Sequence, residues 1–235
     1  MNFKRILYKI SGEVLMGSKE YGQDATVIGS IANDIKNAYN KGIEICISVG
    51  GGNIFRGVRF AESGLDRITG DYIGMLATVM NSLALQSAIE KTGIETRIMS
   101  PIHIPNMCEQ FIRRRALRHL TKGRVLIFAA GTGNPLFTTD TGSVLRGIEM
   151  NCDAVLKGTS VDGVYDSDPK TNPDAKKFDS ISHDEVILKN LRVMDLAAIS
   201  MAKSHNVPIY VFKIRGLENP LCDLLEGKTS HTVIK

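Results

Sequence analysis

The sequence predicts an α/β fold, a mainly parallel sheet with helices on both faces, and two observations carry this prediction. Short β-like segments alternate with helical patterns along the chain, which is typical of right-handed crossovers between parallel strands. Three of these segments end in glycines and small polar residues, and parallel sheets bind ligands in the loops beyond the carboxyl ends of their strands. The 235 residues, of which 43% are hydrophobic, are enough for a core without disulfides or a structural metal.

The β-like segments leave room for a helix between most neighbours. They cover residues 5–10, 44–49, 95–99, 124–130, 154–157 and 208–213. After the first segment, apolar residues repeat at helical spacing from Val27 to Tyr39, and Gly42 suits a left-handed helix cap. After the second, a more apolar helix is predicted from the spacing of Met75, Leu76, Val79, Met80, Leu83 and Ile89.

No long linker, repeat or low-complexity tract interrupts residues 1–235, so we expect a single domain. The most loop-like stretch is 159–179, which contains Gly163, Pro169, Pro173 and five aspartates. A solvated surface excursion would have this composition too. Its position directly after the β-like segment 154–157 favours a binding loop.

Composition excludes several classes of protein. The 29 basic and 25 acidic residues give a net charge of +4, which favours anions without marking a nucleic-acid binder. The cysteines form no CxxC pair, so we expect buried free thiols in a reducing compartment rather than a zinc site or disulfides. The longest apolar run, residues 125–130, is far shorter than the roughly 20 residues of a membrane helix. We therefore expect a cytoplasmic protein without membrane contact.

Three loops suit the binding of phosphate. In Lys9-Ile10-Ser11-Gly12, glycine lets backbone amides approach an anion and lysine supplies charge. Gly50-Gly51-Gly52-Asn53 admits a phosphate closely, although turn chemistry alone also explains three glycines. Residues 131–142 offer amides, hydroxyls and a carboxylate, which suit a base and phosphate oxygens. The dinucleotide-binding motif GxGxxG is absent, because Phe55 or Leu136 stands where its last glycine should be. The Walker phosphate-loop motif is absent as well, because Cys222 stands where its first glycine should be.

The densest basic segment runs from Arg113 to Arg124. A solvated helix face is the simpler interpretation, because Phe111, Ile112, Leu117 and Leu120 have the spacing of a buried stripe. A nucleic-acid surface would gain support from interleaved aromatic residues, which this segment lacks. Nucleic acid is therefore not an expected partner.

These blocks together resemble the bacterial uridylate kinases of the amino-acid-kinase family, in the same order over nearly the whole chain. The matching blocks are residues 9–12, 50–57, 70–71, 75–78, 131–142, 157–159, 161–165 and 168–169. The resemblance implies a three-layer αβα sandwich that moves the γ-phosphoryl group of Mg-ATP to UMP, giving UDP for pyrimidine nucleotide synthesis. It also implies a homohexamer that UTP inhibits.

The resemblance further implies roles for individual residues. Lys9, Asp140 and Lys157 would be catalytic, with Lys9 at the transferred phosphoryl group. ATP would contact Lys9, Ile10, Ser11, Gly12, Gly52, Arg56, Thr159, Tyr165 and Asp168. UMP would contact Gly51, Arg56, Asp71, Thr132, Gly133, Asn134, Pro135, Leu136, Phe137, Thr138 and Thr139. The UMP loops would thus lie mainly in the N-terminal part and the ATP loops mainly in residues 150–235, with Mg²⁺ held mainly by the phosphates of ATP.

Elementary chemistry agrees with these roles. Phosphoryl transfer between two anions needs cations and a fixed in-line geometry, and it needs little covalent help from the protein. Lys9, Arg56, Lys157 and a magnesium ion would supply the charge, while Asp140 would orient the lysines or reach the metal. The acceptor phosphate is already ionised near neutral pH, so no histidine base is required.

Two further aspartates, Asp153 and Asp195, match the family, and Asp195 is placed to cap a helix over residues 196–204. The chain also departs from the family pattern. Gln23-Asp24-Ala25 replaces the usual Gly-Ile-Asp, Gly158 stands where alanine is common, and Leu136 replaces a frequent phenylalanine. The last two are small changes of volume that we expect to alter affinity rather than reaction class.

Two other functions stay open at this point. A kinase of the same fold could act on carbamate or an amino-acid carboxylate, but Arg56 with Asp71 and the 131–141 block favours a nucleotide acceptor. A nucleotide sensor could act on a partner through the basic segment. The joint presence of Lys9, Lys157 and Asp140 disfavours a sensor, which could lose catalytic charges freely.

Overall fold

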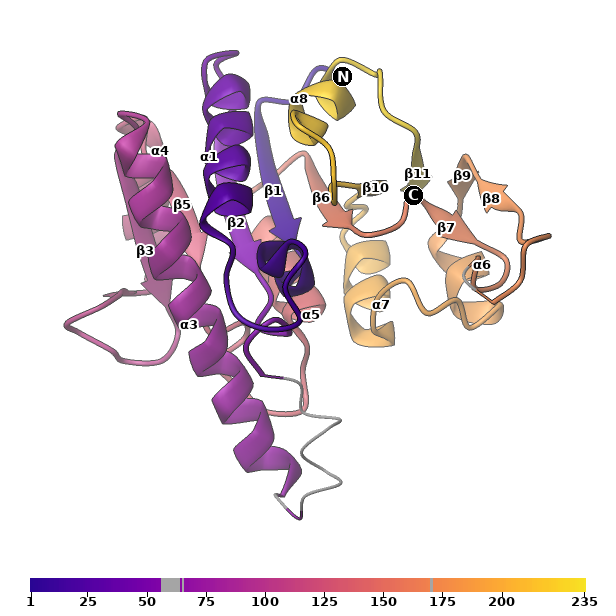
Figure 1. Cartoon of the computed structure of the whole chain (residues 1–235), viewed down its shortest axis with the longest axis horizontal. Helices are drawn as coiled ribbons and strands as arrows, with labels where there is room; N and C mark the ends of the chain where they lie inside the picture. The colour runs from indigo at the N-terminus through magenta and orange to yellow at the C-terminus, as the bar shows by residue number, and fades with distance from the viewer. Residues whose placement is uncertain (56–63, 65, 170) are drawn as a thin grey trace.

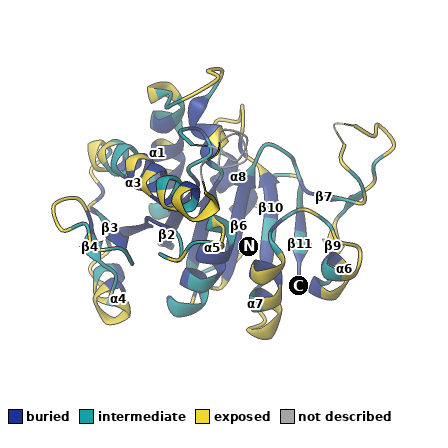
Figure 2. Cartoon of the chain, turned by 90° about the horizontal axis from the view of Figure 1, so that it is seen from below, coloured by how far each residue is buried: buried dark blue, intermediate teal, exposed yellow. Residues whose placement is uncertain are grey.

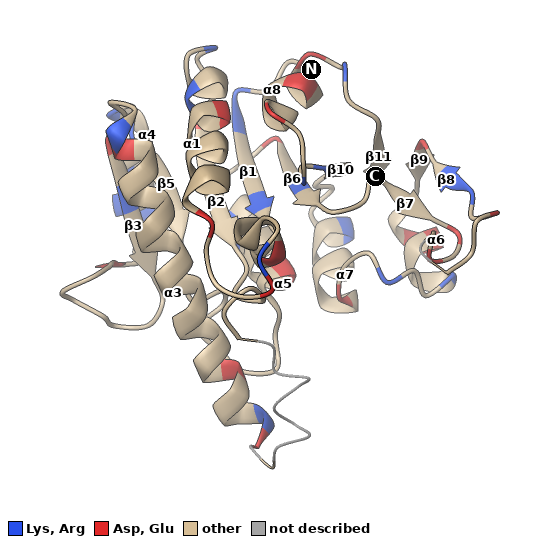
Figure 3. Ribbon diagram, in the orientation of Figure 1, with Lys and Arg blue, Asp and Glu red and all other residues tan. Residues whose placement is uncertain are grey.

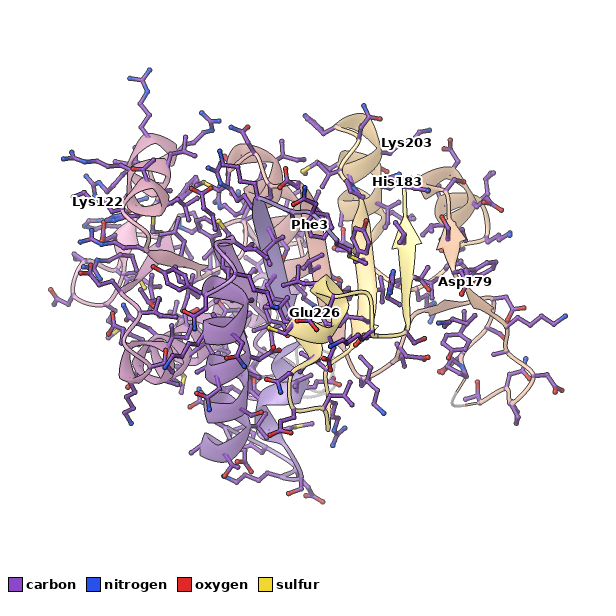
Figure 4. The ribbon with its side chains drawn as sticks, turned by 90° about the horizontal axis from the view of Figure 1, so that it is seen from above. Phe3, Lys122, Asp179, His183, Lys203 and Glu226 are labelled. Atoms are coloured by element: carbon purple, nitrogen blue, oxygen red, sulfur yellow. The ribbon has the colours of Figure 1, made fainter. Side chains whose placement is uncertain are left out.

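The computed structural model describes residues 1–55, 64, 66–169 and 171–235, and a nine-stranded sheet runs through it (Figure 1). The strand order is β4-β3-β5-β2-β1-β6-β10-β11-β9, and every neighbouring pair is parallel except β10 with β11. The strands are β1 (Arg5–Ile10), β2 (Glu44–Val49), β3 (Thr96–Ser100), β4 (Glu109–Gln110), β5 (Val125–Phe128), β6 (Ala154–Thr159), β9 (Ser180–Ile181), β10 (Ile209–Lys213) and β11 (His231–Ile234). Lys122, after α4, and Asp179, before β9, lie at opposite ends of the molecule (Figure 4).

Two layers of helices cover the buried strands (Figure 2). On one face lie the 3₁₀ helix η1 (Gly12–Met16), α1 (Ala25–Tyr39), α3 (Arg67–Lys91) and α8 (Pro220–Leu225); on the other lie α4 (Arg113–Thr121), α5 (Thr139–Glu149), α6 (His183–Leu188) and α7 (Leu196–Ser204). Successive strand residues point to opposite faces. Ile6, Tyr8 and Ile10 accordingly join the core under α1 and α3, whereas Leu7 joins the core under α5 and α7. This confirms the predicted αβα sandwich.

The helix boundaries follow from local capping. Asp24 accepts hydrogen bonds from the Thr26 and Val27 amides and begins α1, and Gly42, with φ of 82°, follows its end. Asp195 accepts the Ala198 amide and begins α7, which confirms the predicted cap.

Strands β1 and β2 have the predicted bounds, whereas the 124–130 prediction is too long. Strand β5 ends at Phe128 because the next turn contains Ala130 and Gly131 at φ of 57° and 54°, outside the extended region. Strand β6 is two residues longer than predicted, because Gly158 and Thr159 pair with β1 and β10. The block around Asp140, which reads as loop, becomes helical from Thr139 onward.

The excursion 159–179 contains a small antiparallel pair, β7 (Val164–Tyr165) with β8 (Lys177–Phe178). All four cysteines are free and buried, as predicted. In α4 the predicted apolar stripe is wrong in part. Leu120 is buried, but Ile112 lies at the helix N-cap and is 47% exposed.

Helix α3 also differs from its predicted pattern, since Leu76 and Met80 are 53% and 54% exposed. The buried face instead includes Thr78, Asn81 and Ser82. Of these, Thr78 and Asn81 bind the backbone of the loops at the strand ends. Among the described residues, α3 alone has the length and mean hydropathy, 1.3, of a membrane span. A core helix passes the same test, and α3 packs on α1 and on three strands of the sheet.

Candidate active site

The carboxyl ends of β1, β2, β5 and β6 meet at one edge of the sheet, where the predicted glycine-rich loops come together. Beside them lies a hollow. Its wall is formed by Lys9, Ser11, Gly12, Glu13, Val14, Gly50, Gly51, Gly52, Thr138, Thr139, Asp140, Thr159, Ser160 and Arg215. Gly12 has to be glycine here, because a Cβ atom would lie 2.6 Å from the Gly50 carbonyl oxygen. The first two predicted phosphate loops therefore pack directly against each other.

Three charged side chains form the centre of this site, and we call them the lysine–aspartate group: Lys9, Asp140 and Lys157. Lys9 on β1 is the register partner of Lys157 on β6, so both side chains leave the sheet on the same face. Asp140, in the first turn of α5, reaches between them. Its Oδ1 lies 2.9 Å from Lys9 Nζ and its Oδ2 lies 2.7 Å from Lys157 Nζ.

Burial makes this group electrostatically strong, since each of the three side chains is at most 14% exposed. Burial opposes the ionisation of Asp140, but the neighbouring ammonium groups outweigh it and hold the pKa of this carboxyl well below its usual value. For Lys157, burial lowers the pKa of the ammonium from 10.5 to about 8, against the attraction of Asp140. Lys157 also donates a hydrogen bond to the Val193 carbonyl. Asp140 thus bridges the two lysine ammonium groups.

Helix α3 holds the second glycine-rich loop, residues 50–53, through side-chain hydrogen bonds. The buried Asn81 side chain donates to the Gly50 carbonyl and to Asn53 Oδ1, both at 2.7 Å. Asn53 and Gln23 donate back to Asn81 Oδ1, at 3.1 and 2.9 Å. Gln23 belongs to the segment that departs from the family pattern, and here it completes this amide network.

The third loop is held by α3 as well. Thr78 Oγ1 accepts the Ala130 amide at 2.8 Å, where β5 has just ended. Two turns earlier in α3, Asp71 accepts the Leu136 amide at 2.8 Å, and Leu136 has φ of 72°. Asp71, a predicted UMP contact, therefore also holds the 132–139 loop, which contains other predicted UMP contacts.

The end of this loop is tied to α7 through Asp195. The Asp195 carboxylate accepts hydrogen bonds from the hydroxyls of Thr138 and Thr141, the latter at 2.6 Å. Thr138 in turn caps α5 by accepting the Asp140 amide at 3.1 Å. Asp195 is therefore more than a helix cap. Asp153 lies elsewhere, where it accepts the amides of Lys4 and Arg5.

A second hollow adjoins the first and shares Ser11 and Thr159 with it. Lys157, Tyr165 and Asp168 lie along its wall. The Tyr165 hydroxyl donates to Asp162 at 2.6 Å, which fixes the ring at the start of the β7–β8 excursion. The excursion is thus a wall of the site rather than only a surface feature.

Most of the predicted residues lie in the first hollow, the second hollow or the 132–139 loop, all at one sheet edge. Ile10 ends β1 beside them, and Asp71 contacts the 132–139 loop through the Leu136 amide. Arg56 lies outside the described residues. The sequence did not predict Arg215 and Ser160 in the first hollow, nor Asn81 beside the 50–53 loop. Of these three, only Asn81 could have been found from the sequence, because it is a polar residue among the apolar positions of a helix.

A mainly parallel sheet with glycine-rich loops and buried lysines at its carboxyl edge defines a phosphotransferase of the α/β class. The chain belongs to the amino acid kinase family, whose sequence profile matches residues 4–213. The uridylate kinase of Erythrobacter litoralis is 54% identical over 232 residues, covering 99% of this chain and 97% of that protein. That of Rickettsia bellii is 53% identical over 235 residues, covering 100% and 98%.

Solved structures agree. The crystal structure of UMP kinase from Bacillus anthracis has a TM-score of 0.93 at 40% identity, and the match covers 100% of this chain and 97% of that one. The structure of UMP kinase from Ureaplasma parvum has a TM-score of 0.94 at 36% identity, with 100% of both chains covered. The predicted family and fold are thereby confirmed.

Proposed function

We propose that this protein transfers the γ-phosphoryl group of ATP to UMP, forming ADP and UDP. The observation that carries the proposal is the lysine–aspartate group, buried where the glycine-rich loops of one sheet edge meet. Relatives named uridylate kinase, about half identical over their full length, support the same reaction.

We assign the phosphates of ATP to the first hollow and its adenosine end to the second. Glycine-rich loops that pack this tightly suit phosphate oxygens. The phosphate contacts proposed for Ile10, Ser11, Gly12 and Gly52 are supported by the place of the last three on the wall of this hollow. The assignment of Thr159, Tyr165 and Asp168 to the adenine nucleotide is supported by their place along the second hollow. The contacts predicted for Arg56 stay a prediction.

We assign UMP to the neighbouring loop. Asp71 would meet the ribose and Gly51 and Thr139 the phosphate, and the remaining contacts would come from Thr132, Gly133, Asn134, Pro135, Leu136, Phe137 and Thr138. Leu136 and Phe137 are 61% and 50% exposed, which leaves apolar surface for a pyrimidine ring. Thr132 and Asn134 already exchange hydrogen bonds with each other, which fixes the loop backbone.

In this reaction Lys9 and Lys157 would face the charge that spreads over the transferred phosphoryl oxygens. Because Asp140 holds both ammonium groups in place before the substrates arrive, little reorganisation is needed at the transition state. The acceptor oxygen of UMP is already anionic, so the protein need only align it with the γ-phosphoryl group.

We propose that magnesium enters with ATP and is held mainly by its phosphates. Within the described chain no three carboxylate, histidine or cysteine side chains gather as a metal site, and both Asp140 oxygens are engaged by lysines. When bound, the ion would neutralise phosphate charge.

We also propose a homo-oligomer. Ile68, Tyr72, Leu76 and Met80 follow one another at four-residue spacing on α3 and are 40–54% exposed, so they form one apolar stripe. Charged residues of α3 lie near its two ends (Figure 3). The same proposal includes six subunits and inhibition by UTP, which the family resemblance supports. It also includes a single domain, which the continuous sheet supports, and a cytoplasmic location, which the buried thiols support.

The proposal is tested by measuring ADP formation with Mg-ATP and each of UMP, CMP, dUMP and AMP, with and without UTP. Selective turnover of UMP is expected. A parallel panel contains glutamate, acetylglutamate, aspartate and carbamate. Turnover of any of these with none of UMP would overturn the proposal, and tight UMP binding without turnover would favour a sensor instead.

A further inference from the structure

The lysine–aspartate group itself brings little net positive charge to the phosphate hollow. Lys9 and Lys157 share the single carboxylate of Asp140, so the three side chains together contribute only one net positive charge. ATP carries several negative charges, and some of its phosphate oxygens would therefore lack a cationic partner among these residues.

Arg215 stands where such a partner is needed. It follows β10, and the Ile214 amide donates to the Thr159 carbonyl at 2.9 Å, so this segment stays beside the end of β6. The Arg215 side chain forms part of the wall of the first hollow, together with Lys9, Gly12 and Thr159. It is exposed rather than packed in the core.

The guanidinium of Arg215 is anchored but not neutralised. Its Nη2 donates to the Gly17 carbonyl at 3.0 Å, at the end of η1, the turn that begins with Gly12. Over residues 1–55, 64, 66–169 and 171–235, Arg215 takes part in no ion pair. Arginine has five N–H donors in a planar fork that suits phosphate, so one hydrogen bond leaves most of this fork available.

We infer that Arg215 binds the phosphate chain of ATP, a role that rests on the proposed function. A nucleotide that spans both hollows would pass Thr159, which belongs to both walls and lies beside Arg215. The transferred phosphoryl group belongs farther along, at Lys9. Arg215 therefore contacts the phosphates that stay with ADP, and it determines nucleotide affinity rather than the rate of transfer.

The test compares Arg215→Ala and Arg215→Lys with Lys213→Ala, which removes a similar exposed charge two residues away, outside both hollows. Calorimetry on the full chain measures the binding of ATP, ADP and adenosine at low and high salt. Since charged hydrogen bonds of this kind are strong, we expect Arg215→Ala to weaken ATP and ADP about tenfold. Adenosine binding and kcat should change less than about threefold, Lys213→Ala should resemble the wild type, and Arg215→Lys should fall between. The loss should shrink at high salt.

Two results would overturn the inference. One is an equal loss of adenosine and ATP affinity in Arg215→Ala, which would make Arg215 only an anchor for Gly17. The other is ATP affinity within about twofold of the wild type. Thermal unfolding checks that each variant folds, and Arg215→Gln replaces Arg215→Ala if the latter does not. UDP formation by the wild type is scored separately, so failure of this inference is distinguishable from failure of the proposed function.

Discussion

Replacing Asp140 by asparagine tests how the site keeps two buried lysines charged. Asp140→Asn preserves the shape of the side chain but removes the charge that lies 2.9 Å from Lys9 and 2.7 Å from Lys157. The two ammonium groups would then repel each other without a carboxylate between them. Lys157 is the more sensitive of the pair, because burial has already brought the pKa of its ammonium to about 8.

The size of the effect follows from the geometry. At an effective dielectric constant of about 20, opposite charges whose centres are about 4 Å apart attract by about 4 kcal/mol. Half of this attraction, after discounting for solvent screening, corresponds to about a 30-fold weaker hold of Lys157 on its proton, at roughly 1.4 kcal/mol for each factor of ten. The pKa of Lys157 therefore falls further below its ordinary value, and most Lys157 side chains become neutral at about pH 7.5. Loss of the proton alone should then lower activity about tenfold.

The assay is the pH dependence of kcat/KM for ATP at saturating UMP, which reports ionisations of the enzyme before ATP binds. Wild-type kcat/KM should fall above about pH 8, as Lys157 loses its proton. In Asp140→Asn the fall should begin at a clearly lower pH, because the carboxylate that favours the charged form of Lys157 is gone. The matched control is Asp153→Asn, the same chemical change at a carboxylate that binds the Lys4 and Arg5 amides outside the hollow. An Asp140→Asn profile that drops equally at every pH, with its alkaline limb in place, would refute this reasoning.

Three further changes give separate expectations. Lys9→Ala should lower kcat by about 10²–10³-fold with little change in UMP affinity, because its interaction strengthens at the transition state; near-normal turnover would exclude this role. Gly158→Ala should reduce the free energy of unfolding, measured by urea titration, by about 1–3 kcal/mol, since the new methyl group would lie 2.8 Å from Ile214. Gly29→Ala, where a Cβ meets open space in α1, should instead raise it by up to about 1 kcal/mol in the same urea titration. Burial raises the pKa of the Asp34 carboxyl from 3.8 to about 6, so the folded state holds this proton more tightly and stability falls as pH rises between these values. Asp34→Asn should lack that contribution, and identical pH dependence of unfolding in both proteins would contradict it.

The sequence predicts the central strands well because each is a short, mainly apolar segment bounded by turn residues. Strands β1 and β2 are buried on both faces, which is why their bounds are predicted correctly. The two-residue strands β4, β7, β8 and β9 have no periodicity to detect. The start of α5 is concealed because its first turn contains threonines and a glycine, which read as loop.

The candidate site is predicted less evenly, because much of it depends on which strands are neighbours. Glycine loops and single lysines are visible locally, but the register of Lys9 opposite Lys157 arises only when β1 pairs with β6, far apart in sequence. Arg215 follows an ordinary strand in an ordinary turn, and only the β6–β10 pairing brings it to the phosphate hollow. Gly158 has a packing reason that letters do not reveal, since Tyr8 and Ile214 occupy the space of its missing Cβ.

The charge pattern of the lysine–aspartate group follows from what the proposed reaction demands of a buried site. Two lysines alone in this environment would not both stay protonated near neutral pH, because burial and mutual repulsion act in the same direction. A second carboxylate would restore their protonation but cancel the positive charge that anionic substrates need. One carboxylate that touches both ammonium groups meets both requirements, and the α5 N-terminus favours its ionised form. The free-energy cost of removing three charges from water then falls on folding rather than on each turnover, which is the condition for electrostatic preorganisation.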